Sequence, residues 1–178
     1  MTTYVAFLRG INVGGNKIIK MADLAKAFTS LGFANVRTLL ASGNVVFEAS
    51  NAKAATSPVI EAKLERAFGK KIGVIVRTGQ EIQAIVKADL FRGIKVTSAM
   101  RLYVTFLPGK PSSTLTLPYE SPEKDFRILR LADDALFSVL TLSPTRGTTD
   151  AMGILEKEFG KAITTRNWNT VVKIARIV

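Results

Sequence analysis

The feature that most constrains the fold of this 178-residue chain is the order of strands and helices along its first half. The pattern of apolar residues predicts strands at Tyr4–Arg9, Val36–Ala41, Val45–Glu48 and Gly73–Arg77, and helices at residues 21–31 and 58–68, the second capped by Ser57. Gly32 and Gly69 follow the two helices as stop signals. The resulting βαββαβ order is the split βαβ of ferredoxin-like folds, which we expect for residues 1–78.

Residues 79–178 predict a second α+β subdomain. Its expected elements are a helix opened by a capping box at Thr78–Glu81, a strand at 101–107, a hairpin turning at Asp133–Asp134, a helix capped by Thr148 or Thr149, and a last amphipathic helix beginning near Trp168. The segment 108–122 holds four of the six prolines and predicts a long exposed loop. We therefore expect an α+β protein of two subdomains, 1–78 and 79–178.

The chain has no cysteine and no histidine, and these absences exclude several classes of chemistry. Disulfides, Cys/His zinc sites, cysteine nucleophiles and Ser-His-Asp triads all require residues that are missing. A general acid or base would have to be a carboxylate, a lysine or a tyrosine. The carboxylates are scattered along the sequence, so we expect no metal site, and nothing indicates a cofactor. Whether the protein is an enzyme stays open.

The formal net charge of +11 favours anionic partners such as nucleic acid or phosphorylated small molecules. A basic composition can equally serve solubility, so the charge by itself does not choose a partner. No apolar run approaches the roughly 18 residues of a membrane helix, and the N-terminus does not resemble a signal peptide. We expect a cytoplasmic protein that does not insert into a membrane.

The predicted topology brings residues that are distant in sequence to one end of the first sheet. In a split βαβ the first and third strands are antiparallel neighbours, so the loop after the first strand should lie beside the turn before the third. The candidate anion site at this end comprises Arg9, Gly10, Asn12, Gly14, Gly15, Asn16 and Lys17 of the loop with Ser42, Gly43 and Asn44 of the turn. Glycine backbones, a helix N-terminus and lysine charge all favour a bound anion there.

Secondary candidates are Lys70 and Lys71, at the same end of the sheet, and Arg166 and Asn167 in the polar segment around the only tryptophan. Each of these candidate residues can also be explained by a purely structural role. The loop matches neither a Walker A motif nor a dinucleotide-binding motif, and its glycines can simply form turns. Ser42–Asn44 can be a hairpin turn, and Asn167 or Thr165 can cap the last helix.

Three motifs, FLRGINVGG (Phe7–Gly15), ASGNVVF (Ala41–Phe47) and TRNWNTV (Thr165–Val171), resemble the signatures of DUF1697, a bacterial family of unknown function. The resemblance implies a cytosolic bacterial protein of α+β architecture. It implies no activity and carries over no catalytic residue.

Two classes of function follow from these observations. The first is the binding of a phosphate-bearing small molecule or other anion at the glycine-rich loop. The alternative is a nucleic-acid-binding module, because a ferredoxin-like sheet also underlies the RNA-recognition module. That alternative is not favoured, since the strands lack the two or three aromatic residues that stack on bases. A structural homodimer is a third interpretation, and the sequence does not indicate the oligomeric state.

Overall fold

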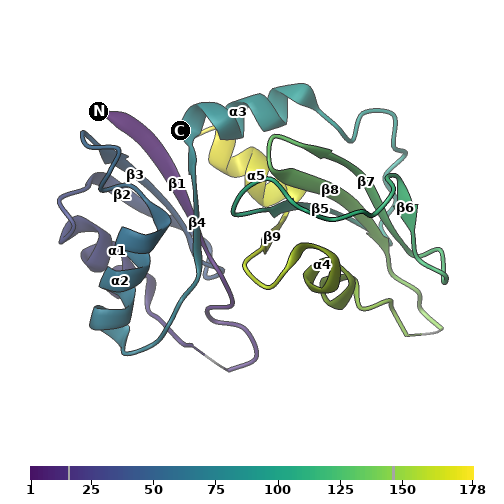
Figure 1. Cartoon of the computed structure of the whole chain (residues 1–178), viewed down its shortest axis with the longest axis horizontal. Helices are drawn as coiled ribbons and strands as arrows, with labels where there is room; N and C mark the ends of the chain where they lie inside the picture. Colours follow the sequence, from purple (N-terminus) through teal and green to yellow (C-terminus); the bar gives the residue numbers. More distant parts are fainter. Residues whose placement is uncertain (16, 146) are drawn as a thin grey trace. The chain divides into compact units, whose positions relative to one another are not determined.

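In the computed structural model, which describes residues 1–15, 17–145 and 147–178, the first half of the chain forms a four-stranded antiparallel sheet with two helices (Figure 1). The elements are β1 (Thr2–Leu8), α1 (Met21–Thr29), β2 (Ala34–Leu39), β3 (Asn44–Ala49), α2 (Ser57–Phe68) and β4 (Val74–Thr78). The strand order is β2-β3-β1-β4, with β1 antiparallel to both neighbours. This is the ferredoxin-like βαββαβ arrangement expected from the sequence.

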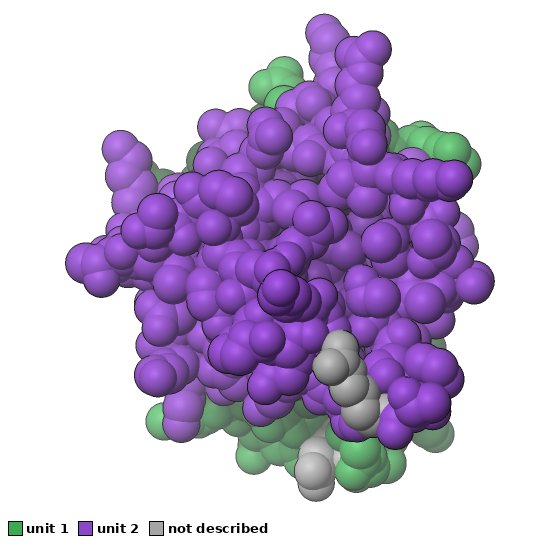
Figure 2. Space-filling model, turned by 90° about the vertical axis from the view of Figure 1, so that its right-hand side faces the viewer, with its two compact units in different colours: residues 1–84, 174–178 green, residues 85–173 purple. Residues whose placement is uncertain are grey.

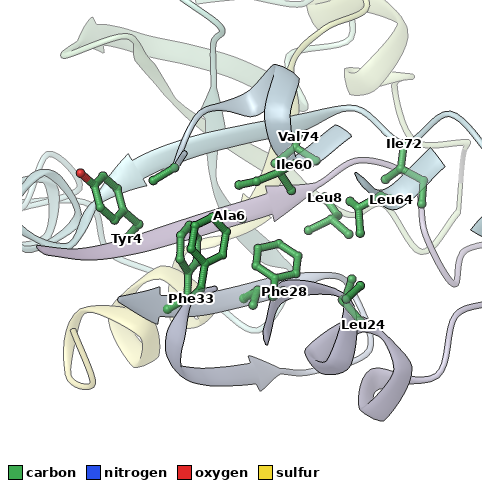
Figure 3. Close-up of a cluster of buried hydrophobic side chains, with 14 of the residues drawn as sticks. Tyr4, Ala6, Leu8, Leu24, Phe28, Phe33, Ile60, Leu64, Ile72 and Val74 are labelled. Carbon is green, nitrogen blue, oxygen red and sulfur yellow. The ribbon is translucent and has the colours of Figure 1, made fainter. Parts of the chain in front are cut away.

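Both helices pack on the same face of this sheet, as predicted, and the alternation of side chains along β1 explains why. Tyr4, Ala6 and Leu8 point to the face that the helices cover, and Figure 3 shows them among side chains of both helices. Phe28 of α1 and Ile60 of α2 are fully buried in this cluster. Successive strand residues point to opposite faces, so a two-residue repeat on β1 is enough to build one apolar surface.

The ends of α2 show how local chemistry defines its length. The N-cap is Thr56 rather than the predicted Ser57, and Pro58 occupies the first turn, where its missing N–H costs nothing. At the other end Gly69 adopts φ 64° and its N–H donates to the Glu65 carbonyl (2.8 Å). Glycine tolerates this left-handed conformation without the strain of a Cβ atom, so the helix stops there.

The second half forms a five-stranded antiparallel sheet with the order β6-β7-β8-β5-β9. Its elements are α3 (Gly79–Ala88), β5 (Met100–Phe106), β6 (Tyr119–Glu120), β7 (Phe126–Ala132), β8 (Ala135–Thr141), α4 (Ala151–Phe159), β9 (Thr164–Asn167) and α5 (Trp168–Ala175). The capping box is confirmed, because Glu81 accepts hydrogen bonds from the N–H and hydroxyl of Thr78. The predicted hairpin is also confirmed, with both turn residues, Asp133 and Asp134, at positive φ.

Two local expectations for this half were wrong. Asp150, not Thr148 or Thr149, caps α4: its carboxylate accepts the Gly153 N–H at 2.9 Å. Residues before the last helix form a strand, β9, which the sequence did not indicate. β9 exists because it pairs with β5, from Tyr103 opposite Asn167 to Phe106 opposite Thr164, and such distant pairing leaves no local signal.

The chain divides into two compact units, coloured separately in Figure 2. Unit 1 comprises Met1–Ala84 and Ile174–Val178, and unit 2 comprises Ile85–Lys173. The division therefore falls within α3 instead of after residue 78, and the C-terminal residues return to unit 1. A hydrogen bond from the Gln83 side chain to the Val178 carbonyl (2.9 Å) joins that tail to α3 inside unit 1.

Candidate functional site

Three segments of unit 1 meet where β1 ends. The Leu8 N–H donates to the Gly43 carbonyl, and the Arg9 N–H donates to the Gly73 carbonyl, both at 2.8 Å. The first bond joins β1 to the β2–β3 turn, and the second joins it to the connection between α2 and β4. The convergence that the topology predicted is therefore present. We call residues 10–20, which continue from this point to α1, the glycine loop.

The glycine loop folds back on itself at Gly14 and Gly15. The Asn12 N–H donates to the Lys17 carbonyl at 3.2 Å, and between them Gly14 and Gly15 have φ 60° and 76°. Positive φ at two successive residues is typical of the tight turns that join antiparallel segments, and glycine adopts it most readily. Both glycines are exposed. Asn16, also predicted for the site, lies outside the described residues.

The Asn12 side chain holds the loop together from within. Its Nδ2 donates to the carbonyls of Ile19 (3.0 Å) and Ala41 (2.8 Å), and its Oδ1 accepts the Ile19 N–H at 2.8 Å. The amide thus fastens the two ends of the glycine loop to each other and to the β2–β3 turn. Asn12 is a positioning residue, because both Nδ2 hydrogens are already donated and its side chain could donate to an anion only by breaking one of these bonds.

The residues of the β2–β3 turn also have structural roles. Gly43 has φ 79°, and a Cβ atom placed there would lie 2.8 Å from Ile11 Cδ1 and 2.9 Å from Leu8 Cβ. The Asn44 side chain is buried and donates to the Leu39 carbonyl (2.8 Å) and the Ser42 hydroxyl (3.1 Å). These contacts explain the SGN sequence as a turn that the glycine loop can approach closely.

The exposed charge at this end of unit 1 comes from lysines. Lys17 Nζ donates to the Lys71 carbonyl at 2.9 Å, which brings the glycine loop beside the α2–β4 connection. Lys70 and Lys71 are exposed, as is Lys20, the N-cap of α1. In the part of the chain that the structure describes, these four lysines form no ion pair. Arg9 is half-buried and has interactions with its surroundings.

The same end of unit 1 carries exposed apolar side chains that the sequence analysis did not single out. Val13 and Ile18 of the glycine loop are 64% and 70% exposed, and Leu40 of the turn is 54% exposed. Leu40 also has φ 58°, which is uncommon for a residue with a branched apolar side chain. Only the conformation of the two loops reveals that these side chains are exposed, since an apolar residue in a predicted loop or strand is usually buried.

The secondary candidates Arg166 and Asn167 lie in unit 2, on β9. Arg166 is 7% exposed, and its Nη1 donates to the Thr164 hydroxyl and the Thr165 carbonyl, both at 2.8 Å. Burial lowers the pKa of Arg166 to about 10, so the guanidinium remains protonated at neutral pH. Arg166 is thus built into unit 2 and is not part of an exposed anion site.

Asn167 borders a hollow of about 610 Å³ within unit 2. The other walls come from the α3–β5 connection, from the start of β5, and from Trp168 and Asn169 at the beginning of α5. We call this hollow the unit 2 pocket. In the sequence its one signal was the polar segment around the only tryptophan; Phe91, Arg92 and Arg101 join it only through the packing of unit 2.

The described residues contain neither a cluster of metal ligands nor a helix that could span a membrane. Among them, no three acidic side chains lie close enough to hold a metal ion. None of the helices within residues 1–15, 17–145 and 147–178 is long and apolar enough to cross a membrane.

Comparison with known proteins gives a family and a fold. A family model described as "Protein of unknown function (DUF1697)" matches residues 1–137, which include the first two motifs and leave the third outside the match. Curated proteins give no match. Among solved structures, the conserved bacterial protein SP0830 from Streptococcus pneumoniae is similar with a TM-score of 0.75, over 99% of this chain and 98% of that one. Because the two sequences are only 22% identical, this likeness shows that the fold is shared and nothing more.

Proposed function

This chain belongs to the DUF1697 family, whose description states no function, and we propose a function from the geometry of the site. The protein binds a phosphate-bearing small molecule or other small anion at the glycine loop. One observation carries the proposal: Lys17 reaches the Lys71 carbonyl, so lysines from two segments share one edge of unit 1. Among the described residues no carboxylate forms an ion pair with them. An anion would supply the missing counter-charge.

The backbone supports the same ligand. Gly14 and Gly15 are exposed, and no atom would lie within 4 Å of a Cβ atom at either position, so a ligand can approach their peptide groups closely. α1 begins directly after the loop, and its N-terminal N–H groups add a partial positive charge near Lys20. Each exposed contribution is small, about 0.3–1 kcal/mol, so the affinity has to come from several acting together.

The roles within the site differ from those that the sequence indicated. Lys17, Lys70 and Lys71 supply charge, and Gly14 and Gly15 supply accessible backbone. Asn12, Gly43 and Asn44 hold the two loops in place and do not face the ligand.

The test is a titration of pyrophosphate at low salt, followed by calorimetry and by the amide NMR resonances of Gly14 and Gly15. We expect both resonances to shift, and we expect Lys17→Ala and Lys71→Ala each to weaken binding by roughly two- to fivefold, as the loss of one exposed charge predicts. Lys26→Ala is the matched control, because Lys26 lies on α1 of the same unit and is paired with Asp23 (4.0 Å).

Binding that is equal in all three variants, or glycine resonances that stay in place, would contradict the proposal. Thermal unfolding of each variant separates a loss of binding from a loss of folding. This control matters for Lys17, whose side chain also makes the hydrogen bond to Lys71.

A further inference from the structure

The unit 2 pocket has the size and the wall chemistry of a ligand site that is separate from the glycine loop. Its volume of about 610 Å³ lies inside the range of roughly 300–1,000 Å³ that is usual for small-molecule sites. All of its lining residues belong to unit 2. Figure 1 shows the elements that supply them: the connection from α3 to β5, the first residues of β5, and the junction of β9 with α5.

One wall of the pocket is aromatic and firmly supported. The rings of Phe91 and Trp168 meet edge to face, with centroids 5.2 Å apart and an angle of 67°. Phe91 is 5% exposed and packs in the same way on Phe137 of β8, at 5.6 Å. Trp168 is half-buried and is one of the residues that line the pocket. A flat ring of a ligand could stack on this surface.

Beside the aromatic wall lie polar groups with free hydrogen-bonding capacity. Asn167 Oδ1 accepts the Asn169 N–H at 3.0 Å, which orients the Asn167 side chain. In the part of the chain that the structure describes, its Nδ2 group and the Trp168 indole N–H have no protein partner. Hydrogen-bond donors next to an aromatic face are suited to the edge of a heteroaromatic ring.

The lining of the pocket also carries positive charge. Arg92 and Arg101 line it together with one carboxylate, Asp89. Nη1 of Arg101 donates to the carbonyls of Ser98 (2.7 Å) and Met100 (2.9 Å), so the guanidinium is anchored at one end and its remaining N–H groups are available. An anchored guanidinium is pre-organised for bidentate binding of a phosphate or carboxylate.

From this combination we propose that the unit 2 pocket binds a heteroaromatic ligand with an anionic group, the chemistry of a nucleoside monophosphate. The ring would lie against Trp168 and Phe91, and the anion would bind Arg101 and Arg92. This site is independent of the anion site at the glycine loop, since the two lie in different units.

Trp168 is the only tryptophan of the chain, so its fluorescence reports on this pocket alone. The experiment titrates AMP into the whole protein with excitation near 295 nm, where the nucleotide does not absorb. Adenosine, ribose 5-phosphate and pyrophosphate are titrated in parallel, because each lacks one part of the proposed ligand. We expect a saturable change with AMP, a weaker response to adenosine, and little response to the two ligands without a ring.

Substitutions assign the response to the pocket. We expect Arg101→Ala to weaken AMP binding at least tenfold, since it removes charged hydrogen bonds. Arg92→Ala serves as the second variant, because Arg92 is exposed and its loss should leave folding intact. Arg130→Ala, at an exposed position of β7 in the same unit, is the matched control and should bind AMP normally.

The loop variant Lys17→Ala separates this proposal from the proposed function. If the pocket is the site, this variant keeps the Trp168 response to AMP even if it loses pyrophosphate binding. No saturable change with AMP up to millimolar concentration would overturn the inference. So would an affinity that is the same in the Arg92→Ala and Arg101→Ala variants as in the Arg130→Ala control.

Discussion

At the scale of single residues, the glycines of the site are not equivalent. Gly43 has a positive φ and no room for a Cβ atom, because Ile11 and Leu8 lie 2.8–2.9 Å from where it would be. Gly14 shares the positive φ, but no atom lies within 4 Å of the equivalent position. Gly43 allows the glycine loop to contact the β2–β3 turn, while Gly14 allows the glycine loop itself to turn.

This difference predicts unequal costs for the same substitution. We expect Gly43→Ala to lower the free energy of unfolding by about 2–4 kcal/mol, the sum of a left-handed alanine and an overpacked contact. We expect Gly14→Ala to cost about 1 kcal/mol, from the backbone conformation alone. Urea denaturation of both variants measures the difference, and equal costs would show that the contacts of Gly43 with Ile11 and Leu8 relax freely.

At the scale of elements, the side chain of Asp125 links the connection before β7 to the connection before α4 in unit 2. Asp125 stands just before β7 and is 4% exposed. Its carboxylate accepts hydrogen bonds from the hydroxyl of Thr149, from the Thr149 N–H (3.0 Å) and from the Ser121 hydroxyl (3.1 Å). Thr149 directly precedes Asp150, the N-cap of α4. Asp125 therefore positions the start of that helix.

These bonds make the contribution of Asp125 depend on pH. The Thr149 hydroxyl is the main cause that holds the pKa of Asp125 below its ordinary value of 3.8, although burial acts in the opposite direction. A carboxyl with a lowered pKa in the folded state stabilises the fold above its unfolded pKa, and that stabilisation is lost as the pH falls through the folded value. The effect should be complete at neutral pH and absent in strong acid.

We expect the difference in unfolding free energy between the native protein and Asp125→Asn to shrink as the pH is lowered below about 4, where the native carboxyl also becomes neutral. Denaturant titrations from pH 7 to pH 2 measure it. Thr149→Val removes the main donor and should flatten the same pH dependence. A difference that stays constant over this range would contradict the role given to the Asp125 charge.

At the scale of the whole molecule, the net charge of +11 raises the possibility of nucleic-acid binding. The surface that such a module would use is the sheet face of unit 1 opposite α1 and α2. On β1 that face carries Val5 and Phe7, which pair with Val46 and Ile75 of the neighbouring strands. These four residues are at most 4% exposed, and Phe7, the one aromatic among them, is fully buried, so they offer no ring on which a base of single-stranded RNA could stack.

We therefore expect weak, sequence-independent binding of RNA and DNA that depends on charge alone. Such binding should fall by orders of magnitude between ~50 and ~200 mM salt if six or more phosphates are contacted. Fluorescence anisotropy with single-stranded RNA and duplex DNA measures this dependence. Affinity that resists salt or discriminates between sequences would point to a dedicated nucleic-acid site and against this expectation.

Signals that act between near neighbours were readable from the sequence. Short runs of residues that favour strands in 4–9 and 45–48, with glycines after each helix, predicted the βαββαβ order, and Thr78 with Glu81 predicted a helix start. The meeting of the glycine loop with the β2–β3 turn followed from topology, because the neighbours of β1 are set once the order of elements is known.

Other features depended on contacts between distant residues, and only the tertiary structure decided them. β9 is a strand because β5 offers it an edge, and Asp150 caps α4 while the Thr149 hydroxyl is held by Asp125. The Asn12 side chain links the two loops because the folded chain brings the carbonyls of Ile19 and Ala41 within hydrogen-bond distance of it. The unit 2 pocket likewise needed packing to bring Phe91 and Arg101 beside Trp168, since hydrogen bonds and ring contacts at that separation leave no periodicity in a sequence.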